Sequence, residues 1–162
     1  MKRALLVVDL QREFEDTDGK FNEILKWVQH QSEMYTYDKI IATVCGNSIN
    51  SPFYKYTGWD KMLNSEPRAL EFTADVIIEK KTYGLPYRVL FDVLPANYVY
   101  DIIGYNTDAC VLKVVLDMAD AGRDIRILTN YCYSSSGEEA HKRGVEVLKS
   151  LLSSAVFSDT NS

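Results

Sequence analysis

The chain has 162 residues, of which 46% are hydrophobic and 25% are charged. This composition is typical of a globular protein and excludes a disordered one, and the length predicts one domain over residues 1–162. Its 18 Lys and Arg against 23 Asp and Glu give a net charge of -5. Nucleic acid and anionic membranes are therefore excluded as main partners, because both require a basic surface.

Short β-rich runs alternate along the chain with segments of helical periodicity. Strands are predicted, in chain order, at residues 4–8, 39–44, 76–78, 98–103 and 125–128. Apolar residues at helical spacing predict helices around residues 21–28, 87–93, 111–119 and 140–152. Nearly continuous apolar strands that alternate with helices predict an α/β fold with a parallel sheet covered on both faces.

One connection departs from this alternation. Residues 46–68, between the second and third predicted strands, are rich in Asn, Ser, Gly, Pro and aromatic residues, with at most a short helix near residues 59–63. So long a connection inside a compact domain is usually a lid or a binding loop.

Chemically useful side chains follow several of the predicted strands. Because parallel strands end at the same edge of a sheet, where ligands bind, residues far apart in sequence are expected to meet there. In chain order, the strands are followed by Asp9, by Cys45, by Glu79, Lys80 and Lys81, by residues 104–110, and by Asn130.

Cys110 is the best candidate for a nucleophile. Asn106, Thr107 and Asp108 are residue types that cap helices, which places Cys110 in the first turn of the helix that follows. Free N–H groups and the helix dipole favour a thiolate there, and the amides of Ala109 and Cys110 are candidate donors to an oxyanion. The alternative is a buried cysteine that acts only as a small hydrophobic residue.

Asp9 interrupts an apolar strand and is a candidate general base, whereas the alternative is a carboxylate that caps a loop. Lys80 ends another apolar strand and would stabilise both the Asp9 carboxylate and a Cys110 thiolate. A lysine that extends from the sheet edge into solvent is the alternative there, and Lys81 competes for the role. The coincidence of three such residues at one edge favours catalysis.

The remaining polar residues predict neither a metal site nor a cofactor. His30 and His141 have no partner at metal-ligand spacing, and Gly104 lies outside any phosphate-binding motif. Cys45 and Cys132 are interpreted as buried residues, although Cys45 could line a pocket. With three unpaired cysteines, and an N-terminal apolar run that ends too soon for a secretory signal, we expect a cytoplasmic protein.

Three segments resemble the isochorismatase-like cysteine hydrolases, the superfamily that includes nicotinamidases. ALLVVDLQREF (residues 4–14) is similar to the family's LLVVDxQxxF, VIIEKKTY (76–83) to vieKxxYsaF, and IGYNTDACV (103–111) to GxxTDxCV. The resemblance implies a catalytic triad of Asp9, Lys80 and Cys110. It selects Lys80 over Lys81, because Tyr83, three residues after Lys80, aligns with the tyrosine of the family's segment. It further implies a three-layer fold around a six-stranded parallel sheet of order 321456, a cis peptide between Tyr105 and Asn106, and a homo-oligomer.

Two segments depart from the family pattern. Members that bind zinc carry a DxH motif after the second strand and a further loop histidine, but this chain reads TVCGNSIN (residues 43–50) and has no histidine between His30 and His141. A metal-assisted nicotinamidase is therefore not expected. The segment after Tyr83 also differs, which alters one wall of the pocket. Candidate substrate-binding residues are Phe14, Asn47, Asn50, Phe53, Trp59 and Tyr83.

These observations predict a metal-free cysteine hydrolase that cleaves a small amide or related C–N bond. One alternative is a non-catalytic member of the same fold that binds a small ligand or a partner protein through the same cleft. A second is a flavodoxin-like signalling domain with Asp9 in an acidic pocket. The second requires further carboxylates at strand ends, whereas the third predicted strand ends in Glu79, Lys80 and Lys81.

Overall fold

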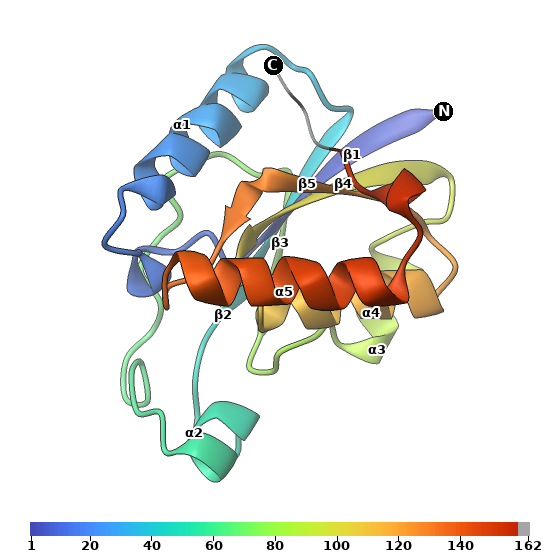
Figure 1. The fold of residues 1–162 in the computed structure, drawn as a ribbon. Helices are drawn as coiled ribbons and strands as arrows, with labels where there is room; N and C mark the ends of the chain where they lie inside the picture. Colours follow the sequence, from blue (N-terminus) through green and yellow to red (C-terminus); the bar gives the residue numbers. More distant parts are fainter. Residues whose placement is uncertain (159–162) are drawn as a thin grey trace.

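A central parallel sheet organises the computed structural model, which describes residues 1–158 (Figure 1). Its strands are β1 (Lys2–Val8), β2 (Lys39–Cys45), β3 (Val76–Lys80), β4 (Tyr98–Tyr105) and β5 (Asp124–Tyr133). They lie in the order β3-β2-β1-β4-β5, and every neighbouring pair is parallel. The α/β class and the parallel sheet are therefore as predicted.

Helices cover both faces of the sheet (Figure 1). The α-helices are α1 (Lys20–Glu33), α2 (Pro52–Thr57), α3 (Tyr87–Asp92), α4 (Cys110–Asp120) and α5 (Glu138–Leu151), with 3-10 turns η1 (Arg12–Phe14) and η2 (Ser154–Val156). Alternate residues of β1 point to opposite faces, so that Leu5 and Val7 pack with α1, whereas Leu6 and Val8 pack with the face that α3, α4 and α5 cover. No helix within residues 1–158 has the length and apolar character needed to cross a membrane.

The predicted sixth strand is wrong for the part of the chain that the structure describes. After α5, the chain makes the short turn η2 and then a single bridge between Phe157 and Ile127 of β5. One bridged residue cannot form a ladder, because a strand needs several consecutive residues to pair. The order is therefore 32145 instead of 321456.

Two other elements differ from their predicted positions. The short helix of the long connection lies at Pro52–Thr57 and not near residues 59–63, because Ser51 caps its start, Pro52 occupies its first turn and Gly58 ends it in a left-handed conformation. β5 runs on to Tyr133, so Asn130 lies inside the strand and Ser134 follows its carboxyl end instead.

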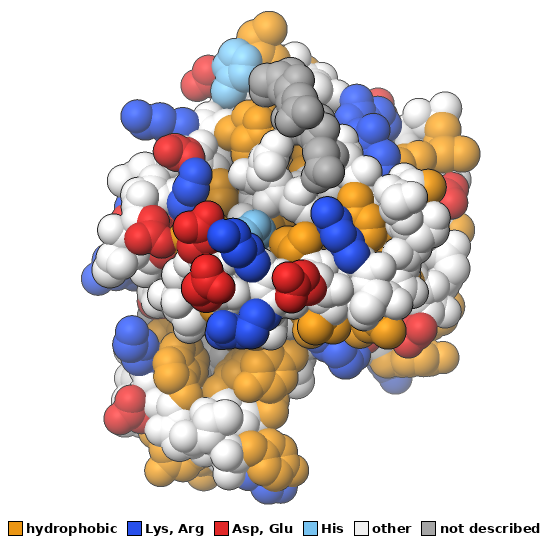
Figure 2. Space-filling view, viewed as in Figure 1, with side chains coloured by type: hydrophobic (Ala, Val, Ile, Leu, Met, Phe, Trp, Pro, Cys, Tyr) orange, Lys and Arg blue, Asp and Glu red, His pale blue; other side chains and the backbone are white. Residues whose placement is uncertain are grey.

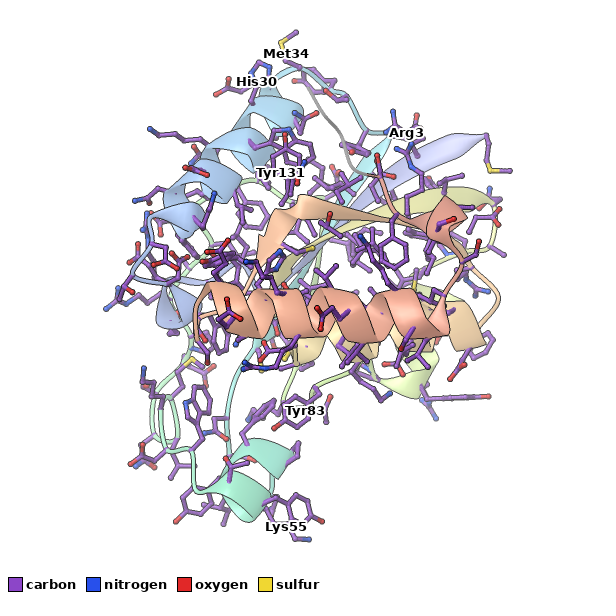
Figure 3. The ribbon with its side chains drawn as sticks, viewed as in Figure 1. Arg3, His30, Met34, Lys55, Tyr83 and Tyr131 are labelled. Carbon is purple, nitrogen blue, oxygen red and sulfur yellow. The ribbon has the colours of Figure 1, made fainter. Side chains whose placement is uncertain are left out.

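The segment around α2 lies apart from the two helical layers (Figure 1). Hydrophobic side chains gather around it on the face that Figure 2 shows. Of the residues of α2, Tyr54 and Tyr56 are exposed to solvent. Tyr83 lies between α2 and the body of the protein (Figure 3), where its ring packs edge-on against Phe53 with centroids 4.8 Å apart. This segment therefore forms one wall beside the sheet edge.

Candidate active site

Asp9 is the residue immediately after β1, and its side chain is fully buried. Its backbone has a φ of 48°, a conformation uncommon outside glycine. Thr43 of β2 holds it twice, because the threonine hydroxyl accepts from the Asp9 N–H at 3.0 Å and donates to Asp9 Oδ1 at 2.6 Å. The carboxylate is thereby fixed in one orientation at the sheet edge.

Lys80, the last residue of β3, faces Asp9. Its Nζ lies 2.9 Å from Asp9 Oδ2, and the ammonium donates to the carbonyls of Thr82 at 2.7 Å and Tyr83 at 3.2 Å. Burial lowers the pKa of Lys80, but the negative charge of Asp9, together with that of the nearby cysteines when they ionise, raises that pKa overall. Lys80 is therefore a permanent cation, whereas Lys81 is exposed to solvent.

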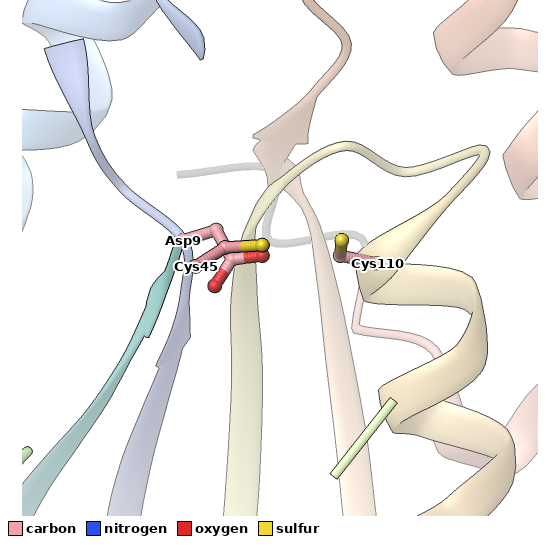
Figure 4. Close-up of side chains that lie close together, drawn as sticks. All are labelled: Asp9, Cys45 and Cys110. Carbon is pink, nitrogen blue, oxygen red and sulfur yellow. The ribbon is translucent and has the colours of Figure 1, made fainter. Parts of the chain in front are cut away.

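Cys110 begins α4, and its side chain meets Asp9 and Cys45 in one buried cluster (Figure 4). The two sulfurs and a carboxylate oxygen of Asp9 all lie within 4.8 Å of one another. The neighbouring Cys45 thiol, then burial and the charge of Asp9, raise the pKa of Cys110 well above its ordinary value, although Lys80 opposes them. The expectation that the helix start favours a thiolate is thus outweighed, and Cys110 rests as a thiol.

Gly104 allows β4 to pass close to the end of β1. It has a φ of +128°, and a Cβ at this position would lie 2.0 Å from the carbonyl oxygen of Val8. A side chain there would push β4 away from β1, and with it the segment that leads to Cys110. The short distance between Asp9 and Cys110 therefore depends on glycine at this position.

Residues 106–109 form a loop that is held at several points between β4 and α4. The peptide bond between Tyr105 and Asn106 is cis, as the resemblance implies. The Asn106 side chain donates to the Ser135 hydroxyl at 2.9 Å and accepts from the Ser135 N–H at 3.0 Å. Thr107 Oγ1 lies 2.7 Å from His141 Nδ1, which ties the loop to α5. This network positions the start of α4, and hence Cys110.

The two N–H groups predicted to donate to an oxyanion, those of Ala109 and Cys110, differ in whether they already make a hydrogen bond. The Ala109 N–H donates to the carbonyl of Asn106 at 3.0 Å, so it is already used within the loop. Cys110 is the first residue of α4, and the N–H groups of a first helical turn have no acceptor within the helix. The Cys110 amide is therefore the better placed of the two donors.

A cavity of about 420 Å³ opens beside Cys110. Both Cys45 and Cys110 line it, together with four of the six predicted substrate-binding residues: Phe14, Phe53, Trp59 and Tyr83. The rings of Phe14 and Trp59 are stacked with centroids 6.0 Å apart, and Phe53 meets Trp59 edge-on. A larger recess of about 1060 Å³ lies beside β3 and reaches Lys80 but neither thiol, so the smaller cavity is the candidate site.

Asn47 and Asn50 are not among the residues that line this cavity. The Asn47 amide instead donates to the carbonyls of Trp59 and Lys61, each at 2.9 Å, so it fastens the aromatic segment. Asn50 is exposed at the surface. Residues that the sequence did not single out, notably Glu13, Ser135 and Ser136, do line the cavity.

No protein-family model and no curated protein matches the sequence, so the comparison rests on solved structures. The pyrazinamidase of Pyrococcus horikoshii in complex with zinc is 22% identical with a TM-score of 0.70, over 93% of this chain and 96% of that one. PnC1 from L. infantum in complex with nicotinate is 14% identical with a TM-score of 0.69, over 97% and 95%. An isochorismatase-like hydrolase from Alkaliphilus metalliredigens is 16% identical with a TM-score of 0.66, over 91% and 90%.

The chain has the isochorismatase-like fold. The three structures span nearly the whole of this chain, which agrees with the resemblance of the segments around Asp9, Lys80 and Cys110. At these identities the likeness establishes the fold, whereas the chemistry depends on the residues of this chain.

The zinc of the pyrazinamidase structure raises the question of whether the present residues suit the same site. At the end of β2, where the family pattern has its DxH motif, this chain has Thr43, Val44 and Cys45. Within residues 1–158, Asp9, Cys45 and Cys110 form the one group of three or more metal-ligating side chains close enough to hold an ion. The histidine-based site of the family pattern therefore does not fit this chain.

Proposed function

We propose that this protein is a cysteine hydrolase that cleaves a small amide or related C–N bond, without a metal, through a thioester on Cys110. The observation that carries the proposal is a buried cluster of a carboxylate, an ammonium and a thiol, of which the thiol lines the smaller cavity. Asp9 and Lys80 form an ion pair at 2.9 Å, and Asp9 and Cys110 lie within 4.8 Å. A thiol nucleophile with a positioned base is the arrangement that acyl transfer requires.

In the first half of the reaction, Asp9 takes the proton of the Cys110 thiol as the sulfur attacks the substrate carbonyl. The carbonyl oxygen becomes negatively charged, and the Cys110 N–H at the start of α4 is placed to donate to it. Asp9 then returns the proton to the leaving nitrogen, and ammonia or an amine departs. The products of this half are a thioester on Cys110 and a carboxylate at Asp9.

In the second half, Asp9 removes a proton from a water molecule that attacks the thioester carbon. The carbon–sulfur bond breaks, the proton returns to the sulfur, and the carboxylic acid product leaves. Lys80 stays protonated throughout, because its pKa is raised and two backbone carbonyls accept its remaining hydrogen bonds. Its role is to keep Asp9 charged and to balance the transient thiolate.

The cavity walls indicate the kind of substrate. Aromatic rings form much of the lining, and flat molecules pack well between such rings. The lining also holds three acidic residues, Glu13, Glu15 and Asp108, against one basic residue, Lys61. This charge balance favours planar amides that are neutral or cationic over anionic ones.

A screen of small amides for ammonia or amine release, combined with mass spectrometry of the intact protein, tests the proposal. We expect turnover and an acyl adduct on Cys110, both abolished in Cys110→Ala. Cys132→Ala is the matched control, since Cys132 is also buried but lies on β5 outside the cavity lining. Labelling that persists in Cys110→Ala would refute the nucleophile, and the absence of any adduct or turnover would favour a non-catalytic binding protein.

The location and assembly of the protein belong to the same proposal. Its three cysteines are free and buried, which suits a reducing compartment such as the cytoplasm. The homo-oligomer that the resemblance implies is tested by light scattering coupled to size-exclusion chromatography, where a mass near that of one chain would contradict it.

A further inference from the structure

We infer that Asp9, Cys45 and Cys110 form a binding site for one thiophilic divalent cation, of which Zn²⁺ and Cd²⁺ are examples. A cation held there would occupy the Cys110 sulfur and stop the reaction proposed above. The binding stands on the geometry alone, whereas the inhibition rests on the proposed function. Two sulfurs and one carboxylate are the donor types that select such cations over Mg²⁺ or Ca²⁺.

The spacing of the three donors suits a tetrahedral ion. With metal–sulfur bonds of about 2.3 Å, two sulfurs on such an ion stand about 3.8 Å apart. The donor atoms of Asp9, Cys45 and Cys110 already lie within 4.8 Å of one another. Small side-chain rotations are therefore enough to close the site around an ion, and the side chains face a common space in Figure 4.

Two of the donors are held in place by neighbours that do not themselves bind the ion. The Cys45 N–H donates to Gln11 Oε1 at 2.7 Å, and Gln11 Nε2 donates back to the Cys45 carbonyl at 3.0 Å. Thr43 fixes Asp9 through its backbone and through Oδ1. Donors that are fixed before binding lose little freedom when an ion arrives.

The Asp9 carboxylate has unused capacity. Its Oδ2 is buried and lies 2.9 Å from the Lys80 ammonium, yet no described residue makes a well-directed hydrogen bond to it. A buried carboxylate oxygen in this state benefits from a further cationic partner. The state of this oxygen therefore supports a bound cation independently of the two cysteines.

The net charge of the cluster and its access from the cavity both suit a divalent cation. Asp9 and Lys80 already cancel, so a divalent cation with two thiolates gives a neutral cluster, and binding releases the two thiol protons to solvent. No oxidation or reduction takes place. Cys45 and Cys110 both line the cavity, which gives the ion an entry path and leaves its fourth position for water.

Titration of the fully reduced protein with Cd²⁺ alone tests the site, because cadmium–thiolate bonds give an ultraviolet charge-transfer band. We expect the band to saturate at one ion per chain and to persist in Cys132→Ser, whose thiol contacts the carbonyls of Leu128 and Ile102 elsewhere in the core. Cys45→Ser and Cys110→Ser should each lose about half of the intensity and bind at least tenfold more weakly. The double variant should show no band.

Two results would overturn the inference: no band in the wild type, or a band that survives in the double variant. Far-UV circular dichroism checks that each variant is folded, and serine preserves the size of the side chain. Since no substrate is present, the outcome is independent of whether the protein hydrolyses amides. The occupation of the Cys110 sulfur, on which the inhibition depends, is tested separately: Cd²⁺ should protect Cys110 from alkylation and a chelator should reverse this, whereas equal alkylation with and without Cd²⁺ would contradict it.

Discussion

Replacing Asp9 by Asn should separate two effects that this carboxylate has on Cys110. Asp9 is the base in the proposed reaction, so the variant should lose hydrolysis by a factor of about 10²–10⁴. As a negative charge, Asp9 raises the pKa of Cys110. The same variant should therefore make the thiol more reactive toward an alkylating agent, which needs no base.

The size of the second effect follows from the distance. The Asp9 oxygen and the Cys110 sulfur lie within 4.8 Å, and unit charges about 5 Å apart interact by about 3 kcal/mol at an effective dielectric constant of about 20. Removing this repulsion increases the thiolate fraction on the order of 100-fold at neutral pH. A less basic thiolate is also a weaker nucleophile, which reduces the net gain in alkylation rate to about tenfold.

The assay is the rate of iodoacetamide labelling at Cys110, followed by peptide mass spectrometry from pH 6 to pH 10. Lys80→Gln is the matched control, because it breaks the same ion pair but removes a charge that lowers the pKa of Cys110. Labelling should be slower in Lys80→Gln and faster in Asp9→Asn than in the wild type. If both variants react faster, local opening of the site explains the change and the electrostatic account is wrong.

Three further substitutions test interactions of buried residues in the sheet and in α5. Thr43→Val removes a hydroxyl that both donates to and accepts from its buried partner, so urea unfolding should show a loss of about 1–3 kcal/mol, and an unchanged value would contradict this. In Gly144→Ala, the new Cβ would lie 2.6 Å from the Thr107 backbone, so the substitution should destabilise α5 by about 1–3 kcal/mol and slow turnover, although Ala usually favours helices. For Asp101, burial raises the pKa but hydrogen bonds from Arg126 and two other groups lower it overall, so wild-type stability should be complete above about pH 4 and fall below it. The variant Asp101→Asn should flatten this fall in acid unfolding curves, and an equally steep fall would refute the assignment.

The proximity of Asp9 and Lys80 at the sheet edge could be predicted, because the apolar pattern locates the end of each strand without knowledge of the packing. Asp9 and Lys80 each end an apolar run, and parallel strands bring such ends together whatever lies between them. The position of Cys45 beside these residues could not be predicted in the same way. In the structure it pairs in register with Lys80 across β2 and β3, and a pattern of apolar residues does not set this register.

The long connection between β2 and β3, in contrast, could not be predicted in detail. The sequence pattern allows at most a short helix near residues 59–63, whereas Ser51, Pro52 and Gly58 bound the observed helix at Pro52–Thr57. Asn47 was expected to meet substrate and instead binds backbone carbonyls, because a buried amide takes whatever partners the folded loop offers. Loop side chains depend on tertiary contacts that sequence patterns do not describe.

The proposed reacting groups and the cavity walls come from different parts of the chain. Asp9, Lys80 and Cys110 belong to strand ends and a helix start within the sheet framework, whereas Phe53 and Trp59 belong to the excursion between β2 and β3. If the proposed function is right, mutations in this long connection can alter which molecules bind while the catalytic residues stay unchanged. Such a division gives a lineage room to exchange one metabolite for another in small evolutionary steps.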